Sequence, residues 1–300
     1  MSDSRETSAP RQVIGTKRFR EPMAKPITTR IFTVANQKGG VGKTTSAVNV
    51  AAALAMGGLK TLIIDLDPQG NASTAFGISR DEVSGMYEVI IKDLPMQSAA
   101  LKIPGYPNLE VIPATQSLAN AEVELVPMVA REMRLKKSLN NYLLDAANRG
   151  ERFDYVIIDC PPSLGLLTIN ALVAAQELLI PIQCEYYSLE GLTLLLHTVS
   201  LIQEHLNPNI KLTTILLTMF DGRTRLANDV AAEVRKHYSA ELIDIPIPRA
   251  VRISEAPSYG QTVMTYDPAS NGAEAYGLVA REIARRGALS SNSNSEKGVG

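Results

Sequence analysis

The chain has 300 residues, of which 45% are hydrophobic and 20% are charged, so it carries enough apolar side chains for a large buried core. This composition excludes a disordered or fibrous protein. No apolar run approaches the roughly 18 residues that a membrane-spanning helix needs, and the amino terminus carries no apolar signal segment. We therefore expect a cytoplasmic protein without membrane insertion.

The charge and cysteine counts exclude two further classes. The net charge of −1 argues against a histone-like general nucleic-acid binder. Residues 1–30 carry a net charge of +4 and the remainder of the chain −5, so a DNA contact in the body must come from a local basic patch. The two cysteines, Cys160 and Cys184, are too few for a disulfide framework or a four-thiolate zinc site, and we expect buried apolar thiols.

The chain is predicted to form one domain between two tails. Residues 1–29 are polar and rich in Ser, Thr, Pro and Arg, which predicts a disordered basic arm. Residues 287–300 are a low-complexity segment that predicts a disordered tail. The folded domain is expected over residues 30–286.

Within the domain, short β-branched runs alternate with helical segments. Strands are predicted at residues 30–35, 60–67, 109–114, 155–160, 177–183, 211–218 and 241–246. Residues 44–58 predict an Ala-rich helix that ends at a Gly pair, and residues 117–149 are largely helical with an interruption at Pro127. This alternation predicts an α/β fold: a doubly wound, mostly parallel sheet with helices on both faces.

The segment 36–45, with the sequence NQKGGVGKTT, lies between the first predicted strand and the first predicted helix. Its glycines let backbone N–H groups approach phosphate oxygens, and the helix amino terminus adds partial positive charge. Lys43 is expected to pair with the β and γ phosphates and the Thr44 hydroxyl to hold Mg²⁺. The predicted phosphate-binding residues are Lys38, Gly39, Gly40, Val41, Gly42, Lys43, Thr44 and Thr45.

This loop departs from the ordinary phosphate-loop pattern, which has Gly where this chain has Gln37. The sequence instead has the form KGGxGKT, in which Lys38 supplies a second cation five residues before Lys43. The alternative for Lys38 is a solvated surface lysine.

Three carboxylates follow the strands that neighbour this loop. Asp159 ends the run YVIID, where a carboxylate of the magnesium site is expected. Asp65 and Asp67 end the second predicted strand, and side chains two apart on a strand share a face, so both can look into the phosphate site. The alternative for this pair is strand-end caps or turn formers in the segment DPQG.

Six segments in order resemble the ParA/Soj family of chromosome and plasmid partitioning ATPases, P-loop NTPases of the deviant Walker A type. They are KGGVGKTT, DLDPQGNAS at 65–73, DCPPSLG at 159–165, PIQCEYYSLEGL at 181–192, IPRAVRISEAPSYG at 247–260 and YDPASNGAEAY at 266–276. The resemblance covers residues 30–286.

The resemblance implies a nucleotide-dependent switch. Family members bind ATP or ADP with Mg²⁺, form a homodimer with ATP, and in that state bind double-stranded DNA without sequence preference. A ParB-type centromere-binding protein stimulates an otherwise slow hydrolysis and releases them, which drives chromosome segregation on the nucleoid.

The resemblance also assigns roles to individual residues. Lys38 would reach the partner subunit's phosphates, Lys43 would serve its own subunit, and Asp67 would position the attacking water, so these three are the predicted catalytic residues. Thr44, Asp65 and Asp159 would form the magnesium site, and the small size of Gly39 would allow dimer closure.

The DNA-facing residues implied by the resemblance are arginines. Arg223 and Arg252 lie where family members place basic residues, with Arg249 and Arg225 as neighbours. The alternative for each is an ordinary surface arginine.

Four other functions share the loop or the fold. A membrane-associated ATPase of the MinD type carries a C-terminal amphipathic basic helix, which SSNSNSEKGVG does not form. A nitrogenase iron-protein relative needs two cluster cysteines, and a small-molecule enzyme of the dethiobiotin synthetase sort needs a polar substrate pocket. A non-enzymatic DNA-binding scaffold that merely holds nucleotide would differ from a partitioning ATPase only in the role of Asp67 and in the absence of hydrolysis. His197, His205 and His237 show no metal-binding spacing and are expected to be non-catalytic.

Overall fold

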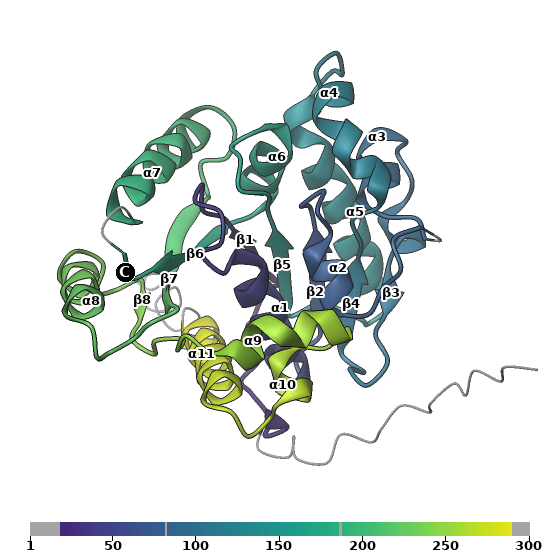
Figure 1. Cartoon of the computed structure of the whole chain (residues 1–300). Helices are drawn as coiled ribbons and strands as arrows, with labels where there is room; N and C mark the ends of the chain where they lie inside the picture. The colour runs from purple at the N-terminus through teal and green to yellow at the C-terminus, as the bar shows by residue number, and fades with distance from the viewer. Residues whose placement is uncertain (1–18, 82, 186–187, 290–300) are drawn as a thin grey trace, which may run out of the picture.

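The computed structural model describes residues 19–81, 83–185 and 188–289. An eight-stranded sheet in the order β3-β4-β2-β5-β1-β6-β7-β8 runs through the molecule (Figure 1). Its pairings are parallel except for β3, which runs antiparallel to β4. The strands are β1 (Arg30–Val34), β2 (Thr61–Asp65), β3 (Leu101–Lys102), β4 (Leu109–Ile112), β5 (Tyr155–Asp159), β6 (Glu177–Gln183), β7 (Lys211–Thr218) and β8 (Leu242–Ile243).

The predicted α/β class is confirmed, because each of the seven apolar runs contains a strand and helices connect them. The helices are α1 (Lys43–Met56), α2 (Asn71–Ala75), α3 (Met86–Ile91), α4 (Ala121–Leu125), α5 (Arg134–Asn148), α6 (Leu166–Ala174), α7 (Ser188–His205), α8 (Arg225–His237), α9 (Val251–Glu255), α10 (Val263–Tyr266) and α11 (Asn271–Leu289). The edge strand β3 was not predicted.

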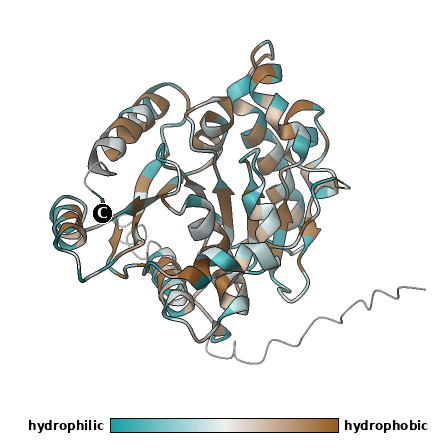
Figure 2. Ribbon diagram, in the orientation of Figure 1, coloured by the Kyte–Doolittle hydropathy of each residue, from teal (hydrophilic) through white to brown (hydrophobic). Residues whose placement is uncertain are grey.

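The sheet separates two hydrophobic cores. Along β2 and β5, Ile64 and Ile158 point into a core shared with α3 to α8, whereas Ile63 and Ile157 point into a core shared with α1, α2 and α9 to α11. Successive strand side chains face opposite sides, so a strand buried on both faces needs continuous apolar residues. The hydrophobic colour of β5 in Figure 2 follows from this requirement.

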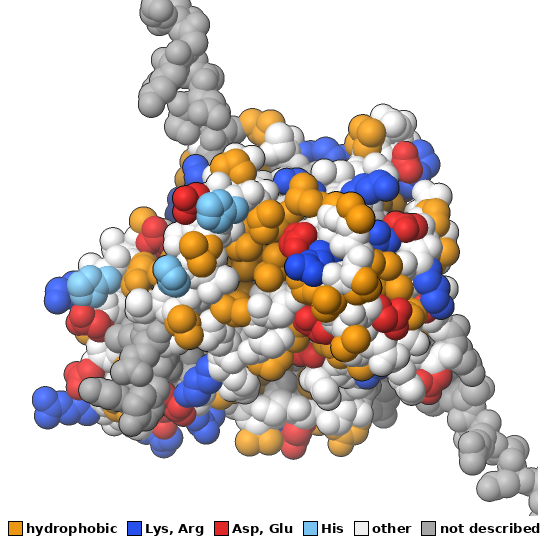
Figure 3. Space-filling model, turned by 90° about the horizontal axis from the view of Figure 1, so that it is seen from above, with side chains coloured by type: hydrophobic (Ala, Val, Ile, Leu, Met, Phe, Trp, Pro, Cys, Tyr) orange, Lys and Arg blue, Asp and Glu red, His pale blue; other side chains and the backbone are white. Residues whose placement is uncertain are grey.

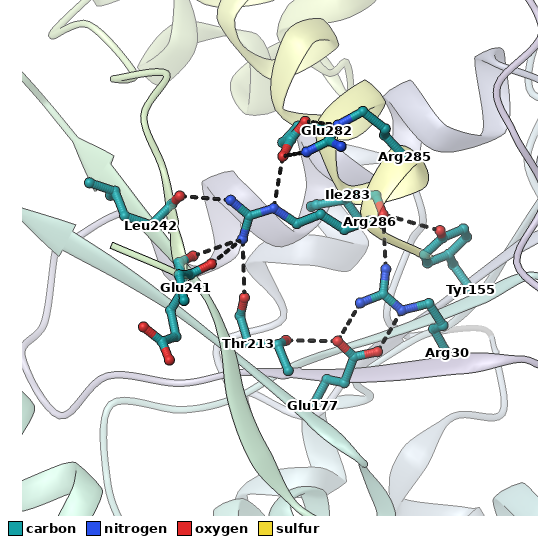
Figure 4. A network of polar contacts seen from close by, with 11 residues as sticks. Arg30, Tyr155, Glu177, Thr213, Glu241, Leu242, Glu282, Ile283, Arg285 and Arg286 are labelled. Carbon is teal, nitrogen blue, oxygen red and sulfur yellow. Dashed lines mark hydrogen bonds and ion pairs between the residues drawn. The ribbon is translucent and has the colours of Figure 1, made fainter. Parts of the chain in front are cut away.

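A polar network joins the amino ends of three strands to α11 (Figure 4). The Arg30 guanidinium donates to the Glu177 carboxylate at 2.6 Å and to the Ile283 carbonyl at 2.9 Å. The hydroxyl of Thr213 donates to the same carboxylate at 2.7 Å, and Arg286 donates to carbonyls near β8. This network holds the C-terminal helix α11 against the amino ends of the strands, which lie opposite the phosphate loop.

Part of the predicted N-terminal arm is folded. The Phe19 ring is only 5% exposed and lies against α11, where a methyl group on Gly277 would come within 2.8 Å of it. The Met23 amide donates to the Gly57 carbonyl at 3.0 Å, and Arg152 donates to the backbone of residues 26 and 27. The prediction of disorder is therefore wrong for residues 19–29. Residues 1–18 lie outside the described residues.

The C-terminal boundary also differs from the prediction. Helix α11 continues to Leu289, so the folded domain extends past residue 286. The rest of the predicted tail, residues 290–300, lies outside the described residues. None of the helices in the described ranges is long and apolar enough to cross a bilayer.

Candidate nucleotide site

The phosphate loop, residues 36–42, leaves the carboxyl end of β1 between its neighbours β5 and β6. In doubly wound sheets ligands bind outside the carboxyl ends of the strands. The loop bends at Gly40 (φ +74°) and Gly42 (φ +86°), a region of backbone conformation that favours glycine. Helix α1 begins at Lys43, and no side chain caps its first amides. These amides are therefore available to phosphate oxygens.

Contacts with two other strands hold the loop in place. The Asn36 amide donates to the Pro181 carbonyl at 2.8 Å and accepts from the Lys38 amide at 3.0 Å. The Thr218 hydroxyl donates to the Val41 carbonyl at 2.8 Å. The loop is thus fixed on one side by β6 and on the other by β7 before any ligand is present.

The two lysines of the loop differ in their surroundings. The Lys43 side chain lies inside the loop with 7% of the residue exposed, and its ammonium donates to the Lys38 carbonyl at 3.1 Å. Burial lowers the pKa of Lys43, and nearby Asp159 and Asp67 oppose this shift. The Lys38 side chain is 37% exposed and forms an ion pair with Glu185 at 2.5 Å. Lys43 therefore faces the phosphate cradle, whereas Lys38 lies on the rim of the cradle.

Asp65 and Asp159 lie side by side at the ends of β2 and β5 and are fully buried. One Asp65 oxygen accepts from the Ser73 hydroxyl and amide, at 2.6 and 2.7 Å. The other Asp65 oxygen and both Asp159 oxygens have no hydrogen-bond partner within the described residues. Burial raises the pKa of Asp65 to about 6, and burial together with the Asp65 charge raises the pKa of Asp159 well above its ordinary value.

Buried carboxylate oxygens without partners fit a cation, because a cation compensates the charge that burial disfavours. Thr44, at the start of α1, faces Asp159 and opposes the rise in its pKa. Across the described ranges, no group of three or more His, Cys, Asp or Glu side chains is arranged to hold a metal alone. Mg²⁺ commonly completes its coordination with substrate phosphates and waters, so this donor set fits Mg²⁺ bound together with a nucleotide.

Asp67 lies in the turn that follows β2. It is buried, one carboxylate oxygen accepts from the Gln69 amide at 2.9 Å, and its carbonyl accepts from the Gly70 amide at 2.8 Å. The turn-forming role considered for this segment is therefore present. The other carboxylate oxygen has no hydrogen-bond partner within the described residues, so it can take a second role.

A cavity of about 380 Å³ next to the loop was not anticipated from the sequence. The segment 247–250 runs beside 217–220, as backbone hydrogen bonds from Ile247 to Leu217 and from Phe220 to Ile247 show. The cavity is lined by Gly42, Thr45, Thr218, Met219, Ile247, Pro248, Arg249, Ala250, Val251, Ile253, Ser254 and Tyr276. A mostly apolar cavity that touches both Gly42 and Thr45 is suited to a nucleoside base. The segment IPRAVRISEAPSYG at 247–260 was the sequence signal that could have indicated this cavity.

The predicted DNA-binding arginines lie on the surface. Arg223 is 90% exposed and pairs with Asp221. Its hydrogen bonds lower the pKa of the Asp221 carboxyl to about 2. Arg249 is also exposed, lies near the same carboxylate, and forms no ion pair within the described part of the chain. Arg252 pairs with two nearby carboxylates and Arg225 with one. The structure thus brings Arg223 and Arg249 together, and the charge of Arg249 is the least compensated.

The expectation for the cysteines is confirmed, because Cys160 and Cys184 are both buried and unpaired. His197, His205 and His237 are exposed on α7 and α8.

Comparisons with known proteins place this geometry in a family. The AAA domain family matches residues 29–212. The sporulation initiation inhibitor protein Soj of Bacillus subtilis is 49% identical over 86% of this chain and 99% of its own length. The chromosome partitioning protein ParA of Myxococcus xanthus is 48% identical over 86% of this chain and 88% of its own.

Among solved structures, cobyrinic acid a,c-diamide synthase from Mycobacterium smegmatis with bound ADP and magnesium superposes with a TM-score of 0.72. It is 37% identical and covers 86% of this chain and 95% of its own. With its phosphate loop, the two lysines of that loop and its mostly parallel sheet, the chain belongs to the ParA/Soj family of chromosome-partitioning P-loop ATPases.

Proposed function

We propose that this ATPase is a nucleotide-dependent DNA-partitioning switch. It binds ATP with Mg²⁺, closes into a homodimer, and as a dimer binds double-stranded DNA without sequence preference on the nucleoid. A ParB-type protein stimulates hydrolysis and releases it, which drives chromosome segregation in the cytoplasm. The observation that carries the proposal is the contrast between buried Lys43, which faces the cradle, and half-buried Lys38, which lies on its rim.

The residues divide the binding of the nucleotide among themselves. The amides of residues 39–45 and the Lys43 ammonium hold the phosphates, and the cavity between residues 217–220 and 247–250 takes the base. Thr44, Asp159 and Asp65 hold Mg²⁺, which when bound neutralises phosphate charge.

Hydrolysis requires a positioned water and extra positive charge on the phosphates. Asp67, with one carboxylate oxygen free, orients the water. Lys38 of a second copy supplies the charge, so a single chain has an incomplete site and assembly is coupled to ATP state. In the single chain Lys38 is held by Glu185, and this ion pair must open before Lys38 can reach across.

The face that bears the carboxyl ends of the strands supports closure of two copies. Figure 3 looks down on this face, where hydrophobic side chains gather near its centre. Exposed apolar side chains occur in and after α4, at Val123, Val126 and Val129, and on α7, at Leu194. Figure 1 shows both helices at this end of the sheet. Exposed apolar clusters of this kind mark interaction surfaces.

DNA binding by the dimer follows from doubling a weak basic patch. With two arginines per subunit, four phosphate contacts give a salt slope of about −3.6, or roughly a hundredfold loss of affinity between 50 and 200 mM salt. A monomer with half of these contacts binds too weakly to be retained, so dimerisation switches DNA binding.

Light scattering on the purified chain tests the assembly step. Molar mass is measured without nucleotide, with ADP·Mg²⁺ and with ATP·Mg²⁺, beside an ATPase assay. We expect twice the monomer mass with ATP·Mg²⁺ and the monomer mass under the other two conditions. A mass that does not respond to ATP in a protein that hydrolyses ATP would contradict the proposal.

A further inference from the structure

The loop that carries Asp67 is held by an arginine with no role assigned so far. Arg80 follows α2, and its guanidinium donates to the carbonyls of Pro68 and Gln69 at 2.5 and 2.6 Å. The same guanidinium donates to the carbonyls of Ala114 and Thr115, which follow β4, at 3.0 and 3.3 Å. One side chain therefore ties the turn after β2 to the exit of the neighbouring strand.

A second contact joins the same two segments. The Ser73 hydroxyl accepts from the Ala114 amide at 3.0 Å while it donates to Asp65 at 2.6 Å. The amide and the carbonyl of Ala114 are thus both used to hold the segment around α2. Asp65, in the magnesium site, is connected through Ser73 to the anchor that Arg80 completes.

The fit between Arg80 and the turn is close. Gly70 has φ +66°, and a Cβ built on it would lie 2.2 Å from the Arg80 Nε atom. The turn itself closes on Asp67, because the Gly70 amide donates to its carbonyl and the Gln69 amide to its carboxylate. Glycine at position 70 is therefore what allows the guanidinium to lie directly on the turn that orients Asp67.

We propose that Arg80 is a positioning residue for ATP hydrolysis, which fixes the Asp67-bearing turn to the exit of β4. It acts through the turn, since its bonds go to backbone carbonyls. A guanidinium has five N–H donors in a rigid planar fork and can serve four carbonyls at once, whereas an ammonium has three donors on one atom. This inference rests on the proposed role of Asp67 in orienting water.

The test compares Arg80→Gln with Arg152→Gln. Arg152 is a matched control because its guanidinium also donates to two consecutive backbone carbonyls, those of Pro26 and Ile27, in the N-terminal segment. Displacement of a catalytic group by about 1 Å can cost up to 10²-fold in rate. We expect Arg80→Gln to lower kcat at least about tenfold while the ATP dissociation constant changes less than about threefold. Arg152→Gln should keep the parental kcat.

Hydrogen exchange supplies a readout that is independent of turnover. The amides of Gln69, Gly70 and Thr74 are bonded within the turn and the start of α2. In Arg80→Gln these amides should exchange faster, with the amides of β1 and β5 unchanged. In Arg152→Gln they should exchange at the parental rate.

Two further variants test the same contact. Arg80→Lys should restore only part of kcat, and Gly70→Ala, which displaces the guanidinium, should have an effect that does not add to that of Arg80→Gln. If Arg80→Gln does not fold, these two variants carry the same measurements. Parental kcat and parental exchange in the Arg80 variants would overturn the inference. Parental hydrolysis by Asp67→Asn would instead overturn the role of Asp67 on which it rests.

Discussion

Replacing each lysine of the phosphate loop separates nucleotide binding from hydrolysis. Lys43 is buried in the cradle and would make charge-assisted hydrogen bonds to two phosphates, each worth about 1.5–3 kcal/mol. Binding breaks its existing bond to the Lys38 carbonyl, at a cost of about 1.5 kcal/mol because the same charged donor makes it. The net loss in Lys43→Ala is then about 3 kcal/mol, or more than a hundredfold in ATP affinity.

Lys38→Ala is the comparison. Its ammonium lies on Glu185 at the rim, so the single chain should bind ATP within about threefold of the parent while ATPase activity falls to background. The assay is equilibrium titration with a fluorescent ATP analogue and Mg²⁺, together with steady-state ATPase rates. Circular dichroism verifies that both variants are folded. Equal ATP affinity in Lys43→Ala and the parent, or equal losses in both variants, would refute the assignment of roles.

Four further outcomes are expected. Gly39→Val should fold and bind ATP, because a Cβ at this position meets nothing within 4 Å in the single chain, yet fail to form the ATP dimer in light scattering. Arg249→Glu should make the salt slope of DNA binding shallower by about 1.8, for one lost contact per subunit, and a parental slope would place the DNA elsewhere. Phe19→Ala should lower the free energy of unfolding by about 3 kcal/mol in urea titrations, and a change below about 0.5 kcal/mol would mean that residues 19–29 contribute no packing. Hydrogen bonds from two arginines lower the pKa of Glu282 to about 2. Glu282 therefore contributes stability above its unfolded pKa of about 4.3, and this stability is lost as the pH falls towards 2. Glu282→Gln should therefore cost about 0.5–1 kcal/mol at pH 7 and little at pH 2, and equal costs at both would contradict the ion-pair role.

The strands and the phosphate loop were predictable because each rests on a local signal. Continuous apolar runs identify strands buried on both faces, and the spacing of Gly39, Gly42 and Lys43 directly after one of them identifies a phosphate cradle. The two-residue strand β3 has no such run, since its residues Leu101 and Lys102 form an edge that is only partly buried.

The contacts that were missed are made between distant segments. Phe19 lies in a polar stretch, and its burial depends on the space above Gly277 on α11. Glu185, the partner of Lys38, and Arg80, the anchor of the Asp67 turn, are single charged residues without periodicity or spacing. Their roles follow from distances across the sheet, which one sequence does not encode in a readable pattern.

We propose that ATP couples assembly to DNA binding. Retention on non-specific duplex DNA, measured without nucleotide, with ADP and with ATP, and repeated with ATP over a salt titration, tests it most directly. We expect retention only with ATP, and a steep loss of retention between 50 and 200 mM salt. Retention that does not depend on nucleotide, or none at all, would contradict it.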